Sequence, residues 1–468
     1  MTSGLLCRIM LSMDRDVLST LLTTWNPHFT DQSHGKWMGT VPREKYLERF
    51  KKLVDVRHVL TLTGVRRAGK STLMYQLMNY LINEKGVPAK NVVYLFLEDI
   101  LVQQYLDLGW KLLEDLYNFY LETYNPVGKV YLFLDEIQGI KEFNRWVSSK
   151  YERQDQIKFI LSGSRRSLVE SESATVLTGR NVQIDVYPLN FYEYLLIKGV
   201  KVEGEASSIE SLRQANFNKY SSILHYLGNY LKEGGYPEIV LASDEEVKRA
   251  LASSYYRDTV TRDVIVPNAV RNPQEVEVLG LQVMSDFTKT HTYSSLSRPQ
   301  KLSIETTKAY LGYFEKAYLF FESKHFSYKT KETQDVQRAR KIYVVDNGLR
   351  NFNIPLLRPD LGQCAENVVY MELRKQTGAI YYWKGKKEID FVVMNPALAF
   401  YNVSYTDQPN EREIESMIEG LQEFNIKKGV VLTKNYFATK KESGKTVEFI
   451  PLWAWLILNG KVFFKKAG

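Results

Sequence analysis

Residues 64–77 read GVRRAGKSTLMYQL, and this stretch decides the fold that the surrounding sequence is expected to adopt. Gly64 and Gly69 are separated by four residues and are followed by Lys70 and Ser71, which is the spacing of a phosphate-binding loop. An apolar run, HVLTLT, precedes the loop, and a segment with helical periodicity follows it. This strand–loop–helix order is the context that such a loop needs, because free backbone N–H groups at a helix N-terminus then face the phosphates.

The loop therefore predicts a site for ATP with Mg²⁺. Lys70 can reach the β- and γ-phosphates, and the hydroxyl of Ser71 can bind Mg²⁺. Arg66 and Arg67 add positive charge, although the sequence assigns them no particular role. The residues predicted to bind the nucleotide are Gly64, Val65, Arg66, Arg67, Ala68, Gly69, Lys70, Ser71 and Thr72.

Length and composition set the limits of the fold. At 468 residues the chain is expected to form about three domains. A hydrophobic share of 44% and a charged share of 25% are typical of a globular protein with full cores. The two cysteines, Cys7 and Cys364, are far apart and have no His/Cys cluster around them, so neither a disulfide framework nor a zinc site is expected. A reducing, cytoplasmic location is the prediction, and because the late apolar run FIPLWAWLIL is too short to span a bilayer, no membrane partner is expected.

Strand-like and helix-like segments alternate from about residue 58. Continuous apolar strands that alternate with helices indicate a parallel sheet covered on both faces. The sequence predicts an α/β nucleotide-binding core over residues 40–200, after an N-terminal extension over 1–39. The strand-like runs are HVLTLTG, NVVYLFLED, KVYLFLDE, IKFILSGS and NVQIDVYPL.

A pair of carboxylates ends one of these strands. The run VYLFLDE closes with Asp135 and Glu136, and buried strands do not normally end in two carboxylates unless these are solvated, paired or bound to metal. Asp135 is predicted to hold Mg²⁺, directly or through water, and Glu136 to orient and deprotonate the attacking water. The alternative is a strand end that simply turns into solvent.

Three further candidates concern the γ-phosphate. The strand KFILSGS ends in Ser162 and Ser164, and Ser164 is the predicted sensor of hydrolysis, with an ordinary turn as the alternative. Arg180 precedes the next strand, so its guanidinium can reach the γ-phosphate of its own or a neighbouring subunit. Arg165 and Arg166 compete for that role. An arginine that acts on a neighbour would imply a homo-oligomer.

The later segments differ in character. Residues 218–270 predict a small helical lid. Residues 274–346 predict three helices followed by two strands, the winged-helix order in which the third helix can enter a DNA major groove. Residues 347–468 read as mixed α and β.

Taken together, the motifs resemble a family of prokaryotic AAA-type ATPases, in which a P-loop domain precedes a winged helix and a C-terminal restriction-endonuclease-like domain. The resemblance covers about residues 40 to 440 and is carried by GVRRAGKSTL, LFLDEIQGI, FILSGSRRSL, LTGR and YPLNFYEYL. It implies an α/β AAA-type parallel sheet with strand order 5-1-4-3-2. It further implies Lys70 and Ser71 as phosphate and magnesium contacts, Asp135 and Glu136 as the acidic pair, Ser164 as sensor and Arg180 as the arginine of the GR element.

The same resemblance implies a metal site in the C-terminal segment. Glu366 on a helix and Asp390 on a strand match two expected ligands, but Asn402 and Ser404 stand where a carboxylate or amide and a lysine belong. The metal would lose a charged ligand and the nucleophile its cationic partner. We therefore expect residues 347–468 to be an inactive nuclease fold that serves in binding or packing.

The charge distribution bears on the partner. The net charge is +8, and several basic residues fall in the predicted wing, with aromatic residues nearby. This pattern suits contacts with nucleic-acid phosphates, but the third helix carries mixed charges, so a protein partner is the alternative. The basic residues are Lys324, Lys329, Lys331, Arg338 and Arg340, and the aromatic ones are Tyr310, Tyr313, Phe314 and Phe326.

The sequence predicts an Mg²⁺-dependent ATPase that acts as a nucleotide-driven switch or motor on a DNA or protein partner. Two alternatives stay open: an ATP-gated signalling switch with little turnover, and an ATP-dependent nuclease.

Overall fold

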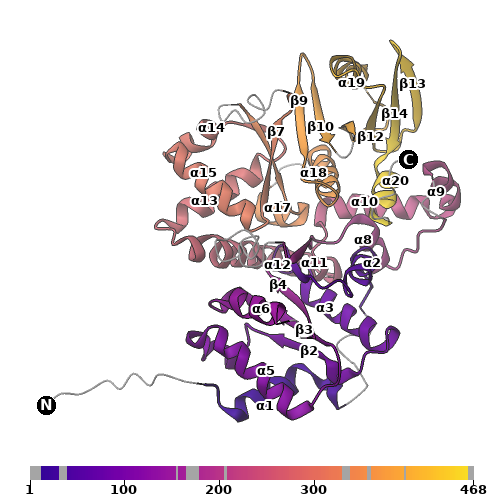
Figure 1. Ribbon diagram of the computed structural model, residues 1–468. Helices are drawn as coiled ribbons and strands as arrows, with labels where there is room; N and C mark the ends of the chain where they lie inside the picture. Colours follow the sequence, from indigo (N-terminus) through magenta and orange to yellow (C-terminus); the bar gives the residue numbers. More distant parts are fainter. Residues whose placement is uncertain are drawn as a thin grey trace. The chain divides into compact units, whose positions relative to one another are not determined.

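The computed structural model groups the chain into two compact units (Figure 1). The first unit comprises Met1–Gly64 and Gly69–Val186, and the second comprises Val65–Ala68 and Tyr187–Gly468. The structure describes residues 12–30, 40–153, 156–164, 179–204, 208–328, 338–355, 360–394, 397–409 and 411–461.

A five-stranded parallel sheet forms the centre of the first unit. Its order, β2-β3-β4-β1-β5, confirms the AAA-type order that the resemblance implied. Every residue of β1 and β3 is buried, which explains why these strands read as unbroken apolar runs. The strands are β1 (Val59–Thr63), β2 (Val92–Phe96), β3 (Val130–Asp135), β4 (Ile157–Gly163) and β5 (Asn181–Asp185).

Helices cover this sheet. α1 contributes three buried leucines, at 18, 21 and 22, to a core that it shares with α5 and the strands. Part of the predicted N-terminal extension therefore packs into the first unit. The helices are α1 (Arg15–Trp25), α2 (Glu44–Leu53), α3 (Lys70–Asn79), α4 (Ile100–Gln103), α5 (Trp110–Tyr124) and α6 (Phe143–Glu152).

Helices dominate the first part of the second unit, as the sequence predicted for residues 218–270. The three helices expected after residue 274 are present as α13, α14 and α15. The helices are α8 (Phe191–Ile197), α9 (Ile209–Ala215), α10 (Tyr220–Glu233), α11 (Pro237–Leu241), α12 (Glu245–Thr259), α13 (Pro273–Ser285), α14 (Tyr293–Ser297), α15 (Ile304–Lys316), α17 (Asn347–Asn353), α18 (Leu361–Arg374), α19 (Glu411–Glu423) and α20 (Leu452–Lys461).

A mixed nine-stranded sheet completes the second unit, in the order β13-β14-β12-β11-β10-β9-β7-β8-β6. β7 pairs with β8 in antiparallel fashion and with β9 in parallel fashion, so strands on both sides of residue 346 belong to one sheet. The strands are β6 (Thr290–His291), β7 (Phe320–His325), β8 (Arg340–Val344), β9 (Ile380–Lys384), β10 (Glu388–Met394), β11 (Leu398–Ser404), β12 (Lys428–Thr433), β13 (Ala438–Glu442) and β14 (Lys445–Pro451).

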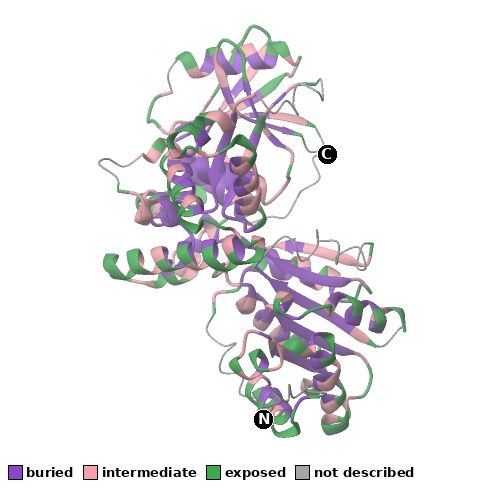
Figure 2. Cartoon of the chain, turned by 90° about the vertical axis from the view of Figure 1, so that its left-hand side faces the viewer, coloured by how far each residue is buried: buried purple, intermediate pink, exposed green. Residues whose placement is uncertain are grey.

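Burial follows the strands in each unit, whereas many helices expose one face (Figure 2). In the second unit α19 packs Met417 and Leu421 against Ile389, Phe400 and Val431 of the sheet. Among the described residues, no helix is long and apolar enough to cross a membrane.

Candidate nucleotide-binding site

The loop between β1 and α3 depends on two glycines. Gly64 has φ +141°, and a Cβ there would lie 2.0 Å from the carbonyl oxygen of Val186. Gly69 has φ +92° and is the N-cap of α3. Side chains of L-residues rarely tolerate either conformation, so glycine is required at both ends of the loop.

Lys70 bends back over this loop. Its side chain is only 4% exposed, and its Nζ donates to the carbonyl oxygen of Gly64 at 3.1 Å. The same Nζ lies 3.6 Å from Oε1 of Glu136, at the end of β3. The ammonium of Lys70 therefore joins the loop to the acidic pair.

Asp135 is fully buried at the last position of β3. Its carboxylate accepts hydrogen bonds from the hydroxyl of Tyr94 at 2.5 Å and from the hydroxyls of Ser162 and Ser71. Burial, and then the charge of Glu136, raise the pKa of Asp135, while the three hydroxyl groups oppose that rise. The hydroxyls hold the carboxylate in a fixed orientation.

Glu136 follows in a left-handed conformation, with φ +57°. Its backbone N–H donates to Oγ of Ser162 at 3.0 Å, and its Oε2 accepts from Nε2 of Gln138 at 2.5 Å. A glutamate is uncommon in this region of conformational space, and such residues concentrate at functional sites. The turn directs the two neighbouring carboxylates to different partners.

Tyr94 is the member of the site that sequence reasoning missed. It is paired in register with Phe133, two residues before Asp135, and its ring lies 4.9 Å from that of Tyr75. The available signal was a hydroxyl-bearing residue inside an apolar strand. Only the pairing of β2 with β3 brings that hydroxyl to the carboxylate.

The residues predicted to contact the γ-phosphate are Ser164 and Arg180. Ser164 is buried, and Ser162, two residues before it, contacts both Asp135 and the backbone N–H of Glu136. Arg180 precedes β5 and turns toward α6, where it donates to Oγ of Ser148 at 3.0 Å and pairs with Glu152 at 2.5 Å. The competing arginines at 165 and 166 lie outside the described residues.

The loop arginines, for which the sequence assigned no role, belong to the segment grouped with the second unit. Nε of Arg66 lies 2.9 Å from Oδ2 of Asp263, whose side chain is 1% exposed. Arg67 lies 3.6 Å from Glu238, and its guanidinium is 5.4 Å from the ring centre of Tyr255. Both arginines are therefore paired with carboxylates.

The donor set near Asp135 fits Mg²⁺. Mg²⁺ takes oxygen ligands, keeps several waters and usually needs one or two carboxylates in addition to phosphate oxygens. The carboxylate of Asp135 and the hydroxyl of Ser71 supply such oxygens. Within the described part of the chain, no three His, Cys, Asp or Glu residues are arranged to hold a metal by themselves.

A second charged centre lies in the C-terminal part of the second unit. Nζ of Lys341, on β8, lies 2.9 Å from Glu366 of α18, 2.7 Å from Glu388 and 3.0 Å from Asp390 of β10. Burial lowers the pKa of the Lys341 ammonium, but the three carboxylates outweigh burial and raise that pKa well above its usual value. Burial also raises the pKa of Glu366, which accepts a hydrogen bond from the hydroxyl of Tyr343 at 2.8 Å.

The two positions that depart from the nuclease pattern have other contacts. Oδ1 of Asn402 accepts from the backbone N–H of Asp390 at 3.0 Å, and its Nδ2 donates to Oγ of Ser416 at 2.9 Å. The hydroxyl of Ser404 lies 3.3 Å from that of Thr406. Asn402 and Ser404 therefore form hydrogen bonds with neighbouring residues, and neither adds a charge to the centre around Lys341.

The predicted wing is less available than the sequence suggested. Arg340 is buried and pairs with Glu322 at 3.3 Å, and Arg338 contacts Nδ1 of His325 at 2.8 Å, whereas Lys324 is exposed. The residues at 329 and 331 lie outside the described residues. Of the aromatic residues expected beside the wing, Tyr310, Phe314 and Phe326 are buried in the core and Tyr313 is half-buried.

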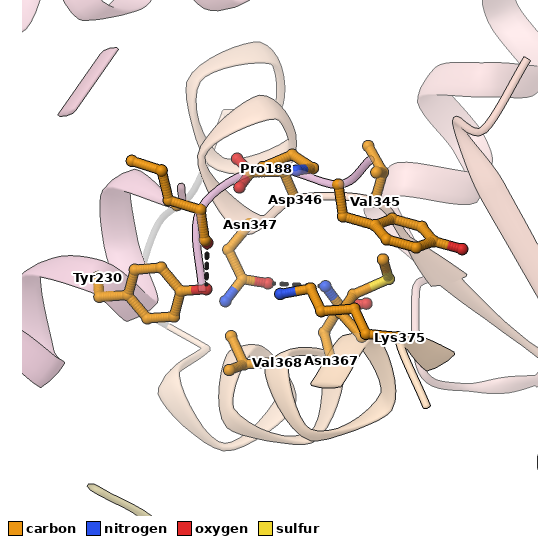
Figure 3. A pocket seen from close by; sticks show the side chains of 12 residues that line it. Pro188, Tyr230, Val345, Asp346, Asn347, Asn367, Val368 and Lys375 are labelled. Atoms are coloured by element: carbon orange, nitrogen blue, oxygen red, sulfur yellow. Dashed lines mark hydrogen bonds between the residues drawn. The ribbon is translucent and has the colours of Figure 1, made fainter. Parts of the chain in front are cut away.

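A small cavity in the second unit lies beside Asp346 (Figure 3). Its volume is ≈ 20 Å³, which is room for about one water molecule. Asn347 and Asn367 are hydrogen-bonded across it at 3.0 Å, and the hydroxyl of Tyr230 donates to the carbonyl of Leu189 at 2.9 Å. The cavity is too small for a nucleotide.

Three family models match the chain. Residues 56–195 match a model described as an AAA domain. Residues 224–359 and 361–455 match two models described as domains of unknown function, DUF8612 and DUF4143.

The chain is also similar along most of its length to curated proteins. One, an uncharacterized protein of Methanocaldococcus jannaschii, is 29% identical over 418 residues, which cover 85% of this chain and 88% of the relative. Another, an uncharacterized protein of Haemophilus influenzae, is 26% identical over 427 residues, covering 88% of this chain and 98% of the relative.

Solved structures with partial similarity include the Orc1 protein of Aeropyrum pernix in complex with DNA. It shows 11% identity and a TM-score of 0.30, covering 77% of this chain and 98% of that chain. DnaA of Aquifex aeolicus bound to AMPPCP shows 13% identity and a TM-score of 0.25, covering 62% of this chain and 92% of that chain.

Proposed function

We propose that this chain, whose residues 56–195 match an AAA domain, is an Mg²⁺-dependent ATPase that acts as a nucleotide-driven switch or motor on a DNA or protein partner. One observation carries the proposal. The ammonium of Lys70 contacts both the loop carbonyl of Gly64 and the carboxylate of Glu136, next to a buried Asp135 that is hydrogen-bonded by Ser71.

In this proposal the polyphosphate replaces the present partners of Lys70. Phosphate oxygens would take the place of the Gly64 carbonyl and of Glu136 around the ammonium. Glu136 would then be free to accept a proton from the attacking water. Asp135 and Ser71 would hold Mg²⁺, which neutralises charge on the β- and γ-phosphates when bound.

The remaining assignments are proposals of the same site. Ser164 is proposed as sensor, with Ser162 as the residue that donates to the carboxylate of Asp135 and accepts from the backbone N–H of Glu136. Arg180 would have to leave Glu152 to reach a γ-phosphate, in its own chain or in a second copy of a homo-oligomer. A cytoplasmic location and a lid over 218–270, a winged helix over 274–346 and an inactive nuclease fold over 347–468 complete the proposal.

The choice between a DNA and a protein partner rests on the wing. Two of its arginines are engaged with Glu322 and His325, which leaves fewer free cations than the sequence suggested. Lys324 and Lys384 are both exposed, and the backbone N–H of Lys384 donates to Nε2 of His325, the residue after Lys324, at 3.3 Å. This pair of lysines is the proposed contact for nucleic-acid phosphates.

Phosphate release by the full-length chain tests the site. We expect Lys70→Ala to lose ATP binding and turnover together, because the phosphates lose their ammonium partner. Glu136→Gln should bind ATP normally but release phosphate about 100-fold more slowly, since the base is lost while the metal site remains. Lys85→Ala, which removes a partly exposed ammonium paired with Asp55, is the matched control and should leave the rate unchanged.

The outcomes separate the alternatives. Unchanged rates in both site variants would reject the nucleotide site. Tight ATP binding by the wild-type chain with slow release, with and without DNA, would instead favour the signalling switch with little turnover.

A further inference from the structure

The buried centre around Lys341 is built from three separate elements. Lys341 comes from β8, Glu366 from α18, and Glu388 and Asp390 from β10. The lysine side chain is 3% exposed, and one oxygen of each carboxylate lies within 3.0 Å of its Nζ. An ammonium has three N–H donors, so the three carboxylates use its full donor capacity.

Other contacts fix the carboxylates around that point. Oδ2 of Asp390 accepts from the backbone N–H of Val403 at 2.9 Å, while its Oδ1 faces the lysine. Oε1 of Glu366 accepts from the hydroxyl of Tyr343 as well as from Lys341. Contacts besides the one with Lys341 therefore hold two of the three carboxylates, those of Glu366 and Asp390.

The resemblance noted in the sequence implies a divalent metal at this place, held by Glu366 and Asp390. The residues present do not fit one. Both carboxylates already bind the same ammonium, which has no lone pair to offer a metal, and Mg²⁺ requires oxygens at about 2.0–2.1 Å around its own centre. Asn402 contributes no charge and turns to Asp390 and Ser416.

We propose that the ammonium of Lys341 occupies the position of the divalent cation, so that this centre is a metal-independent, lysine-filled acidic site. The lysine neutralises part of the carboxylate charge and ties β8 to β10 and α18. A metal can enter only when the ammonium is removed. The inference is independent of the ATP site, because all of its residues lie in the second unit.

The test is a Mn²⁺ titration of the full-length, nucleotide-free chain, in which electron paramagnetic resonance measures free Mn²⁺. We expect the wild-type chain and Asp390→Asn to give the same titration, since no metal uses Asp390. Lys341→Met keeps an apolar stem of similar length and removes the charge. It should gain one Mn²⁺ per chain, bound at least tenfold more tightly than by Lys341→Met/Asp390→Asn.

Two controls isolate the effect of this lysine. Lys341→Arg keeps the positive charge and should gain no Mn²⁺ site. Lys375→Met removes a lysine whose ammonium lies 3.2 Å from Glu372, a single carboxylate on the same α18, and should also gain none.

Removing a buried ammonium leaves three unpaired carboxylates, which destabilises the fold strongly. If Lys341→Met is unfolded without metal, recovery of its thermal transition by Mn²⁺ but not by the same concentration of NaCl supports the proposal. An Asp390-dependent Mn²⁺ site in the wild-type chain overturns it, whatever the variants do. A folded Lys341→Met that gains no site overturns it as well.

Discussion

The two carboxylates that end β3 have different surroundings, and this difference separates their chemistry. Asp135 is fully buried and bound by three hydroxyls, so its position is fixed. The side chain of Glu136 is 11% exposed and is paired with the ammonium of Lys70, a partner that phosphates can replace. Neighbouring titratable groups in unlike environments divide into separate roles. These surroundings support the proposal that Asp135 holds the metal and that Glu136 takes the proton.

Asp346 allows a pH test at the scale of one residue. Burial raises its pKa from 3.8 to about 6, against hydrogen bonds from the backbone N–H groups of Gly235, Leu349 and Gly348 and the charge of Lys375. A carboxyl whose pKa is higher in the folded state binds its proton more tightly there. Its contribution to stability is therefore present at low pH and is lost as pH rises through about 6.

We expect the free energy of unfolding of the wild-type chain, relative to Asp346→Asn, to fall by about 1 kcal/mol between pH 5 and pH 7, because Asn does not titrate. Urea unfolding followed by tryptophan fluorescence at both pH values measures the difference. The same difference at pH 5 and pH 7 would contradict the prediction.

The loop between β1 and α3 tests the fold at the scale of one element. Gly64→Ala would place a Cβ 2.0 Å from the carbonyl oxygen of Val186, so the loop backbone must shift away from the phosphates. We expect at least a tenfold loss of ATP affinity, measured by calorimetry with Mg²⁺.

Gly86→Ala is the matched control for this loop. Gly86 also has a positive φ, +74°, but apart from its chain neighbours no described residue would have an atom within 4 Å of a Cβ added there. We expect a loss of stability of about 1 kcal/mol with unchanged ATP affinity. If both alanine variants lost ATP affinity equally, the close approach of residue 64 to Val186 would not be the cause of the loss.

The sequence predicted the pairing of strands better in the first sheet than in the second. Each run of the first sheet was predicted as a strand, and the observed order agrees with the resemblance. In the second unit β7 and β8 were expected as a separate wing, but β7 also pairs with β9. Periodicity identifies a strand and its buried face, but it does not identify the partner strand, which depends on contacts between distant segments.

At the scale of the whole molecule, the net charge is +8, and the proposed DNA partner would bind in a salt-dependent way because binding releases counterions from the phosphates. We expect double-stranded DNA to stimulate phosphate release, with less stimulation at higher salt. Lys324→Ala with Lys384→Ala should lower the slope of log affinity against log salt by about 2, since each exposed lysine would contact one phosphate.

The control removes the same charge elsewhere. Lys440 and Lys441 are exposed on β13, at the far edge of the sheet, and their double alanine variant should keep the salt slope. No change in phosphate release with single- or double-stranded DNA, at either of two salt concentrations, would point to a protein partner.

The sequence by itself predicted the residues of the candidate nucleotide site in the first unit. Four residues between Gly64 and Gly69, then Lys70, specify a phosphate loop because those constraints act within a few residues. The carboxylates after an apolar strand were likewise visible locally. Hydrophobic periodicity then predicted the parallel α/β core.

Only the tertiary structure decided which side chains complete each site. Tyr94 reaches Asp135 because β2 lies beside β3, and Lys341 reaches Asp390 although 49 residues separate them. Arg180 turns to α6, and Arg66 pairs with Asp263. Such contacts follow from strand order and packing across the chain, and local spacing does not encode them.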